Sequence, residues 1–377
     1  MGYKWLSFSV RYLVNVEDLN NVESAGNYIR HRRAPIVFKE NGIYTVVYAP
    51  VVSGEMIAHG YQMNLVKLAL QKGLPVDSLT KQGILLKRGA GDKVKVKQNN
   101  NEIEIIVHEG TKCTDLGNEE ENEEKGKKKK EKKKVFEEEC KYELCVIQED
   151  IVEDVAGFLN PNRQVKRVSN VAFSYMIPAL DAIKASTITP QFHTRYTSKD
   201  LIEHQSLYNV ETASALYVLT GYLNIDGIGK TQNCKECKPI DNKTSPEGKI
   251  IDSKQIREKA AIDALMLTLT QFLYGAKQAR FKPIVEIEAL VVSFSEKPFN
   301  LPPINNDFIE YLKQVTFTAD AFADFLGINN VLINYYTKDK VKIDEDEIKK
   351  DKNKDKLHVT LQGKDNPVEV FKQTNEG

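Results

Sequence analysis

A compact cationic run, Arg30-His31-Arg32-Arg33, stands just before a proline in this 377-residue chain. Adjacent cations are not needed to stabilise a hydrophobic core, so the run indicates either a solvated loop or a surface that binds an anion. Farther along, Ser53-Gly54-Glu55 is typical of the start of an amphipathic helix, and a helix N-terminus is well suited to a phosphate group. Residues 22–62 are therefore predicted to contact a phosphate backbone.

A second candidate region, residues 157–205, interleaves basic and aromatic side chains. An extended loop needs such a mixture to contact phosphates and to stack on exposed bases. The alternative is a β-hairpin with its own small core, and the two are compatible. The residues concerned are Arg163, Lys166, Arg167, Phe173, Tyr175, Met176, Phe192, His193, Arg195 and Tyr196. A further basic turn, residues 275–283, contains Lys277 and Arg280.

The five cysteines are the remaining candidates for site chemistry. Their number is odd, which makes a disulfide framework unexpected in an intracellular protein and favours reduced thiols. Cys234 and Cys237 have the spacing of a metal knuckle, and Cys140 with Cys145 could complete a tetrahedral zinc site. One such pair is a weak signal, so we expect no cofactor, with a structural zinc as the alternative.

The composition restricts how a polyanion could be bound. Lys and Arg together number 53, as do Asp and Glu, so the net charge is zero and binding must depend on local patches. The length allows two ordinary domains, or one domain with large insertions. No apolar run is long enough to span a bilayer, and residues 1–10 alternate like a strand rather than a signal peptide. We therefore expect a cytoplasmic protein without a membrane partner.

Strict alternation of residue type predicts a half-buried strand over residues 6–16. Its apolar face would run from Leu6 to Val16, and its polar face would suit solvent or a nucleic acid lying across the sheet; the polar residues are Ser7, Ser9, Arg11 and Asn15. A strand over 42–49 precedes the helix that Ser53 opens, and on that helix His59 and Gln62 point away from the apolar stripe. Residues 93–97 and 103–108 are predicted to form a hairpin.

Two charged tracts interrupt the second part of the chain. Residues 118–134 are acidic and then rich in lysine, and such blocks cannot bury enough apolar surface to order. A second mixed-charge tract covers 338–356. Between them we predict a central strand over 207–226, a helix capped by Ser253, a strand over 284–294 and a helix over 307–326. This order of elements predicts an α+β fold, a ferredoxin-like or RRM-type palm with large insertions, and such sheets often bind RNA.

The residues also resemble a known family. The sequence is similar to the CRISPR-associated backbone subunit of archaeal type I Cascade (type I-A), in the DevR-like branch of the RAMP superfamily. The resemblance rests on several co-linear motifs: S-x-R-x-L-V-N over 9–15, ES-x-GN-x-x-x-H-R-x-AP-x-V over 23–37, P-V-V-SGE-x-x-AH-x-YQ over 50–62, Q-F-H-T-R-Y over 191–196, Y-N-V-E-x-x-S-A-L-Y over 208–217, and GAK-x-x-R-x-x-P over 275–283.

The resemblance implies an antiviral ribonucleoprotein. The palm would carry inserted fingers and a thumb hairpin, and copies would stack along a CRISPR guide RNA, beside other Cascade subunits, to present the guide to invading DNA. No residue would be catalytic. The implied RNA contacts are Arg11, Asn27, Arg30, His31, Arg32, Arg33, Ser53, Gly54, Glu55, His59, Gln62, Arg163, Lys166, Arg167, Met176, Gln191, His193, Arg195, Lys277 and Arg280.

The expected division of the chain follows from this implied architecture. Residues 1–112 would form the first half of the palm with the basic loop, and 113–156 an insertion containing the disordered tract 118–134. Residues 157–205 would be a thumb-like insertion, 206–300 the second half of the palm, and 301–377 a C-terminal helix with a flexible charged tail.

Two other functions remain open at this point. A metal-independent endoribonuclease would use His31, His193 or His204 as acid or base, and neighbouring cations would lower the pKa of His31. A DNA-binding transcriptional regulator is the second alternative, although no helix-turn-helix pattern with a basic recognition helix is visible.

Overall fold

The computed structural model describes residues 2–25, 28–89, 93–98, 101–106, 113, 128–196, 205–234, 244–245, 248–249, 251–276, 278–305, 307–339 and 358–373. The chain divides into two compact units, each made of segments that are distant in sequence. Unit 1 comprises Met1–Tyr61, Ala172–Leu223 and Met266–Gly377. Unit 2 comprises Gln62–Val171 and Asn224–Leu265. The predicted thumb-like insertion over 157–205 therefore falls partly in each unit.

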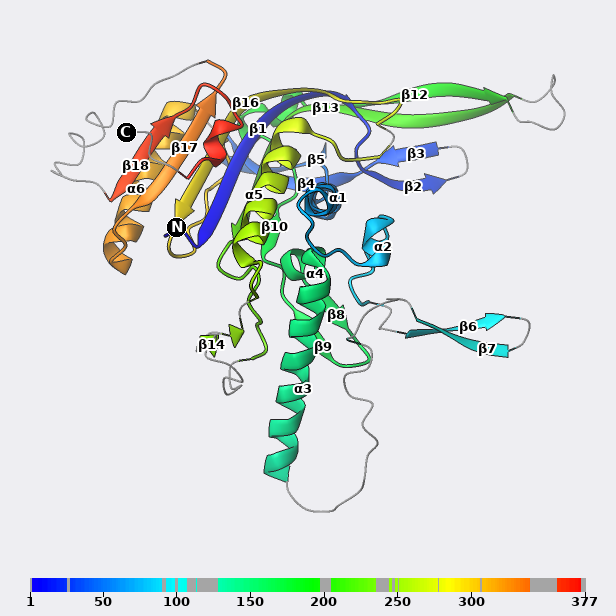
Figure 1. The fold of residues 1–377 in the computed structure, drawn as a ribbon. Helices are drawn as coiled ribbons and strands as arrows, with labels where there is room; N and C mark the ends of the chain where they lie inside the picture. Colours follow the sequence, from blue (N-terminus) through cyan, green and yellow to red (C-terminus); the bar gives the residue numbers. More distant parts are fainter. Residues whose placement is uncertain are drawn as a thin grey trace. The chain divides into compact units, whose positions relative to one another are not determined.

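Unit 1 is built on a mixed sheet (Figure 1). The strands lie in the order β18 (Val359–Gly363), β17 (Val331–Thr337), β16 (Ile284–Ser295), β1 (Trp5–Glu17), β13 (Gln205–Asn224), β3 (Tyr28–His31) and β2 (Asn21–Ala25). Strands β10 (Val171–Phe173), β11 (Ile177–Pro178) and β12 (Thr187–Tyr196) also pair with β13. Helices and a sheet of mixed strand direction confirm the predicted α+β class, and β13 confirms the predicted central strand.

Both faces of the sheet around β1 are covered by helices. On one face, the hydroxyl of Tyr12 donates to the carbonyl oxygen of Leu269, at 2.7 Å, in the last turns of α5 (Lys254–Gln271). The other face carries Ala289 and Val291, which are the strand partners of Arg11 and Ser9. These two residues share a hydrophobic cluster with α6 (Phe308–Leu326), so α6 covers the face that the sequence predicted to be polar and open.

The prediction of an open polar face on β1 is therefore wrong. Ser7 is fully buried, and its hydroxyl lies 2.8 Å from that of Ser293 on the neighbouring strand. Small hydroxyl groups are tolerated in a core when they hydrogen-bond to each other, so they do not identify a solvated face. At the end of the strand, Val16 was expected among the apolar residues but is exposed, because its backbone has a left-handed φ of 52°.

Two hairpins complete the part of unit 1 that concerns the site. Strand β4 (Arg33–Glu40) pairs with β5 (Ile43–Pro50) as a separate two-stranded sheet. Strand β12 pairs with the first half of β13 in a long antiparallel hairpin, which extends beyond the rest of the sheet in Figure 1. Short 3-10 turns lie at Leu180–Ala185 and Glu369–Phe371. The tract 338–356 lies almost entirely outside the described residues.

Unit 2 contains helices and small hairpins. Helix α1 (Gly54–Gln71) enters it from unit 1, and α5 begins in it; its own elements are α2 (Ser78–Lys81), α3 (Lys128–Glu149), α4 (Ile151–Ala156), the predicted hairpin β6 (Lys93–Gln98) and β7 (Asn101–Ile106), β8 (Phe158–Asn160) with β9 (Val165–Arg167), and β14 (Thr244–Ser245) with β15 (Gly248–Lys249). The lysine-rich end of the predicted disordered tract is helical from Lys128. Lys and Glu favour helix, so charge blocks alone did not predict its structure.

Buried ion pairs organise the interior of unit 2. The guanidinium of Arg167 lies 2.7 Å from a carboxylate oxygen of Glu143 and 2.7 Å from one of Asp154. Arg257 binds the other oxygen of Asp154 at 3.0 Å. All four side chains are buried, and removing one partner from such a group leaves an uncompensated buried charge.

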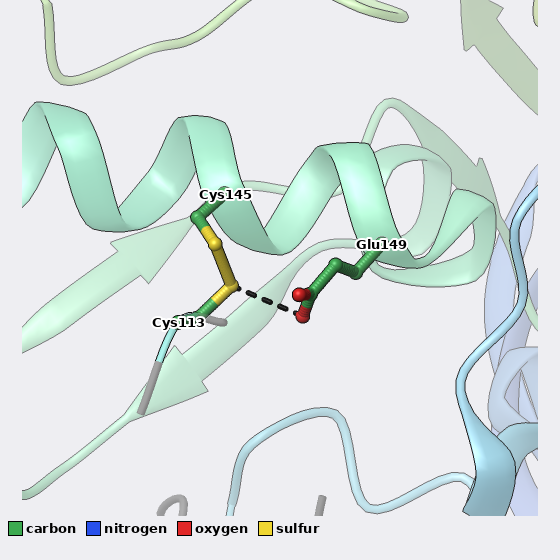
Figure 2. A group of neighbouring side chains, drawn as sticks. All are labelled: Cys113, Cys145 and Glu149. Atoms are coloured by element: carbon green, nitrogen blue, oxygen red, sulfur yellow. Dashed lines mark hydrogen bonds between the residues drawn. A yellow bond between two sulfur atoms is a disulfide. The ribbon is translucent and has the colours of Figure 1, made fainter. Parts of the chain in front are cut away.

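Four of the five cysteines form disulfides, which contradicts the expectation of reduced thiols. Cys113 pairs with Cys145, and Cys140 with Cys234, at Cα separations of 5.7 and 4.9 Å. Figure 2 shows the first pair beside Glu149, a carboxylate oxygen of which lies 3.0 Å from the Cys113 sulfur. A disulfide sulfur has neither a thiolate to bind a metal nor a proton to donate, so Cys140, Cys145 and Cys234 do not fit the zinc site that the sequence suggested. Cys237 lies outside the described residues.

The helices of the described residues include none that is long and apolar enough to cross a bilayer.

Candidate nucleic-acid interface

The predicted basic run lines a surface pocket of about 530 Å³ in unit 1. The run connects β3 with β4, and the parallel pairing of β3 with β13 places it beside Glu211. The pocket is lined by Val22, Tyr28, Arg30, His31, Arg32, Arg33 and Glu211. Arg30 is exposed and its guanidinium carbon lies 5.5 Å from the centre of the Tyr28 ring.

Glu211 fixes the geometry of this pocket. Its carboxylate accepts hydrogen bonds from the hydroxyl of Tyr28 at 2.8 Å, from the backbone N–H of His31 at 3.0 Å and from Arg33 at 3.0 Å. Burial would raise the pKa of the Glu211 carboxyl, but these hydrogen bonds and the charge of Arg33 outweigh burial and lower it. The ionised carboxylate therefore holds Arg33 and the backbone of the run in place.

Arg32 offers the clearest unsatisfied donor in the pocket. Its Nε is buried and has no hydrogen-bond partner among the described residues. A buried guanidinium nitrogen without an acceptor is unfavourable, and a phosphate oxygen is an acceptor that suits it. The pocket thus combines the exposed Arg30 and the half-buried Arg32 with a third arginine, Arg33, that is held by a carboxylate.

His31 belongs to the interior and not to the surface of the pocket. It is 2% exposed, and its Nε2 lies 2.6 Å from a carboxylate oxygen of Glu17. Burial acts to lower the pKa of His31, but the hydrogen bond and charge of Glu17 outweigh it, and the pKa is raised. The predicted lowering of the His31 pKa by neighbouring cations is wrong, and a side chain buried in this way has little surface to offer RNA.

A second cluster surrounds Tyr208 on the same strand. The ring of His193, directly opposite on β12, stacks on that of Tyr208 with centres 5.2 Å apart, and Phe281 meets the His193 ring edge-on. Arg280, from the predicted basic turn, donates to the Tyr208 hydroxyl at 3.2 Å. The Nε2 of His193 is buried without a partner among the described residues. Two segments that the sequence singled out, 191–196 and 275–283, therefore meet here.

The two clusters share one strand but not one face. Successive side chains of a strand project to opposite sides, so Tyr208 and Glu211, three positions apart, point in opposite directions. The basic run and the basic turn therefore lie on different faces near the start of β13, where Arg30 and Arg280 are both exposed.

The start of α1 is a packing site as well as a helix cap. The Ser53 hydroxyl accepts a hydrogen bond from the backbone N–H of Met56, and the Ser53 N–H donates to Asn20. A Cβ at Gly54 would lie 2.4 Å from the carbonyl oxygen of Phe173, so close approach of two backbones requires this glycine. Glu55 and His59 are exposed on the first turns of the helix.

Four other predicted contacts are engaged by ion pairs or packing within the described protein: three are buried, and Arg11 is half-buried. Arg11 is held by Asp181 at 2.9 Å and by Glu288 at 3.5 Å. Arg167 belongs to the buried ion pairs of unit 2; Met176 and Gln62 are buried. Residue type alone cannot distinguish these from surface residues, because burial depends on contacts distant in sequence.

The remaining predicted contacts lie in several places. Arg163 lies over the Tyr142 ring at 4.7 Å, and Lys166 is exposed, both in unit 2. Gln191 is half-buried on β12. Asn27 and Lys277 lie outside the described residues, as does the side chain of Arg195.

Sequence reasoning missed the anchors Tyr28, Glu211, Tyr208 and Phe281. Tyr208 and Glu211 stood in one of the quoted motifs and Tyr28 inside another, but they were treated as strand residues. A carboxylate that binds an arginine run could have been sought among the acidic residues of the neighbouring motif. The pairing of β3 with β13 supplies the missing information.

The sheet and its cationic end define an α+β protein able to bind a polyanion. Residues 8–316 match the family described as CRISPR-associated negative auto-regulator DevR/Csa2. The chain belongs to this family.

Two relatives from one organism agree with this membership. The chain is 61% identical over 341 residues to CRISPR-associated protein Cas7/Csa2 1 of Saccharolobus solfataricus, covering 89% of this chain and 93% of that protein. It is 35% identical over 311 residues to CRISPR-associated aCascade subunit Cas7/Csa2 2 of the same organism, covering 82% and 84%. A subunit of a solved CRISPR RNA-guided surveillance complex in its pre-nicking state has a TM-score of 0.48 and 10% identity, covering 97% of this chain and 98% of that one.

Proposed function

We propose that this chain is a backbone subunit of a type I CRISPR surveillance complex and binds the guide RNA through Arg30, Arg32 and Arg33. The observation that carries the proposal is the pocket lined by three arginines, in which one buried guanidinium nitrogen, the Nε of Arg32, has no hydrogen-bond partner among the described residues. Membership of the DevR/Csa2 family supports it, as does a relative named as an aCascade subunit. Copies of the chain, other subunits of the complex and target DNA paired with the guide are the proposed partners, and no cofactor is needed.

The proposal includes the finer architecture. Strand β13 lies between β1 and the short strands β10 and β11, which follow α1 in the chain. A third strand inserted between the two strands of a βαβ unit is the ferredoxin-like arrangement, so unit 1 is proposed as the RRM-type palm. Unit 2 would then be the fingers, and the β12–β13 hairpin the thumb.

This role needs backbone contacts and not base readout. Base pairing between guide and target supplies sequence specificity, so the protein should bind phosphates whatever the guide sequence. Guanidinium groups suit this task because they bind phosphate oxygens in pairs.

Charge reversal tests the proposed site. In the double variant Arg30→Glu/Arg32→Glu, affinity for single-stranded RNA should fall at least about tenfold, and the slope of log K against log salt should decrease by about 1.4, since two phosphate contacts are lost. Fluorescence anisotropy at several salt concentrations measures both.

The matched control is Lys4→Glu/Lys297→Glu. Both lysines are exposed, and they lie next to Trp5 and Ser295, which pair with each other. The Trp5 ring stacks on Tyr222, which is eleven positions along β13 from Glu211, so the control lies away from the pocket. This control makes the same change of net charge. If both double variants lost RNA affinity equally, the arginine pocket would not be the binding site.

We propose a non-catalytic role, with endoribonuclease activity as the competing function. Among the described histidines, His193 favours the competitor, because its Nε2 lies beside Arg280 and Tyr208 and has no hydrogen-bond partner among the described residues. Purified protein incubated with CRISPR repeat RNA and EDTA should leave the RNA intact. Specific cleavage that disappears in His193→Ala would establish the enzyme instead.

A further inference from the structure

The outward face of the β4–β5 hairpin carries large exposed side chains. Tyr44 and Tyr48 are 73% and 72% exposed, and Val37 and Val46 are also exposed. The register places Val37 opposite Val46 and Pro35 opposite Tyr48, so these residues share one face. Exposed aromatic and aliphatic side chains gathered on one face indicate a binding surface.

The opposite face of the hairpin is anchored. Phe38 and Ala49 are buried in a cluster with Ile183, and Ile36 and Val47 pack against it. The outward side chains therefore project from strands that packing holds in place, and the surface is preformed.

The charges on this face suit an anion. Arg33 and Lys39 project from the same side as the tyrosines, and the side chains at the alternating positions 33, 35, 37, 39, 44, 46 and 48 include no carboxylate. The ammonium of Lys39 lies 5.6 Å from the centre of the Tyr44 ring. Arg33 also lines the basic pocket, so the face continues directly from that pocket.

We propose that this face is a stacking platform for single-stranded RNA, onto which the guide runs from the basic pocket. Bases would stack on the rings of Tyr44 and Tyr48, and Lys39 would bind a phosphate. Aromatic rings on a strand beside a cationic groove bind single-stranded RNA in this way without reading its sequence. The proposal rests on the proposed function and adds the surface that takes the bases.

The spacing of the rings fits separate bases. Four residues of a strand span about 14 Å, whereas stacked neighbouring bases lie about 3.4 Å apart. The two rings therefore cannot hold adjacent stacked bases, and each would take its own base from an extended strand. A second copy of this chain is the less favoured occupant, because the face offers cations and ring surfaces without carboxylates to pair across a protein interface.

Removing each ring tests the platform. Tyr44→Ser and Tyr48→Ser should each weaken binding of an RNA of about eight nucleotides, a length suited to a single site, by roughly 5- to 100-fold. The slope of log K against log salt should stay unchanged, because no phosphate contact is lost. Tyr44→Phe and Tyr48→Phe should retain affinity. Phe325→Ser, on α6, is the matched control for loss of an exposed ring and should bind RNA normally.

The outcomes separate this inference from the proposed function. Unchanged affinity in both serine variants, with weakened binding in Arg30→Glu/Arg32→Glu, would overturn the platform and leave the pocket. If the two serine variants bind RNA as wild type does, but their RNA-free particles have a smaller mass than wild type by light scattering, the face is a contact between copies of the chain. A wild-type protein that does not bind RNA would overturn both.

Discussion

The imidazole of His31 and the carboxylate of Glu17 form a buried pair behind the arginines that face the pocket. Glu17 also accepts hydrogen bonds from the Tyr217 hydroxyl at 2.9 Å and from the Leu19 backbone N–H at 2.8 Å. In sequence, His31 is indistinguishable from its cationic neighbours, and its role depends on a residue fourteen positions earlier. The sequence singled out the arginines of the run as candidates for binding an anion, but residue type alone did not separate them from the buried His31 or from Arg167, which belongs to a buried group of ion pairs.

This pair makes stability depend on pH. Because the pKa of His31 is raised in the folded state, its stabilising contribution is full below the ordinary value of about 6.5 and is lost as the pH rises through the raised pKa. The unfolding free energy of wild type should therefore fall relative to that of His31→Gln between pH 6 and pH 9. Urea unfolding at a series of pH values measures this, and a difference that grows with pH would contradict the assignment.

Helices and strands with a regular alternation of apolar and polar residues were predictable from the sequence. The elements that pack against them were not. The sequence indicated β13, α6 and the β6–β7 hairpin correctly, since each follows the period of its own secondary structure. It failed on the second face of β1, because only the packing of α6, about three hundred positions later, decides whether alternating serines are solvated. It indicated the start of α1 correctly, but it did not show that the carbonyl oxygen of Phe173 lies against Gly54.

The start of α1 provides a test at this scale. Gly54→Ala should lower the unfolding free energy by about 1 to 3 kcal/mol, because the added methyl group would overlap the carbonyl oxygen of Phe173. Glu55→Ala, at the exposed neighbouring position, should change it by less than about 0.5 kcal/mol. Thermal and urea unfolding of both variants measure the difference. Equal stability would show that the two backbones separate without cost.

The whole chain forms two units whose segments alternate, and the sequence suggested consecutive segments instead. The charged composition indicated that segments were inserted. No local sequence pattern indicates that the chain passes back from unit 2 to unit 1 at Ala172 and at Met266. The disulfides were missed for a related reason. Their partners are 32 and 94 residues apart, so spacing drew attention to the nearby Cys237 and away from the true partners. Intracellular disulfides do occur in proteins of hyperthermophilic archaea.

Reduction should weaken unit 2. Each cross-link closes a long loop, so Cys113→Ser/Cys145→Ser and Cys140→Ser/Cys234→Ser should each lose about 4 kcal/mol of stability on the chain-entropy estimate. Calorimetry with and without reductant, together with mass spectrometry of unreduced peptides, checks this. RNA affinity at the arginine pocket should persist, because that pocket belongs to unit 1.

The pairing of β13 limits where residues can be inserted into this protein. The hydrogen bonds of β13 to β3 and β12 determine which side chains meet Tyr28 and His193, and adding one residue would turn every following side chain to the opposite face. An insertion between Tyr208 and Glu211 would therefore turn one cluster to the opposite face of the strand relative to the other. Relatives should accordingly differ in length at the connection between β12 and β13 and in the charged tracts, while the strand itself keeps its number of residues.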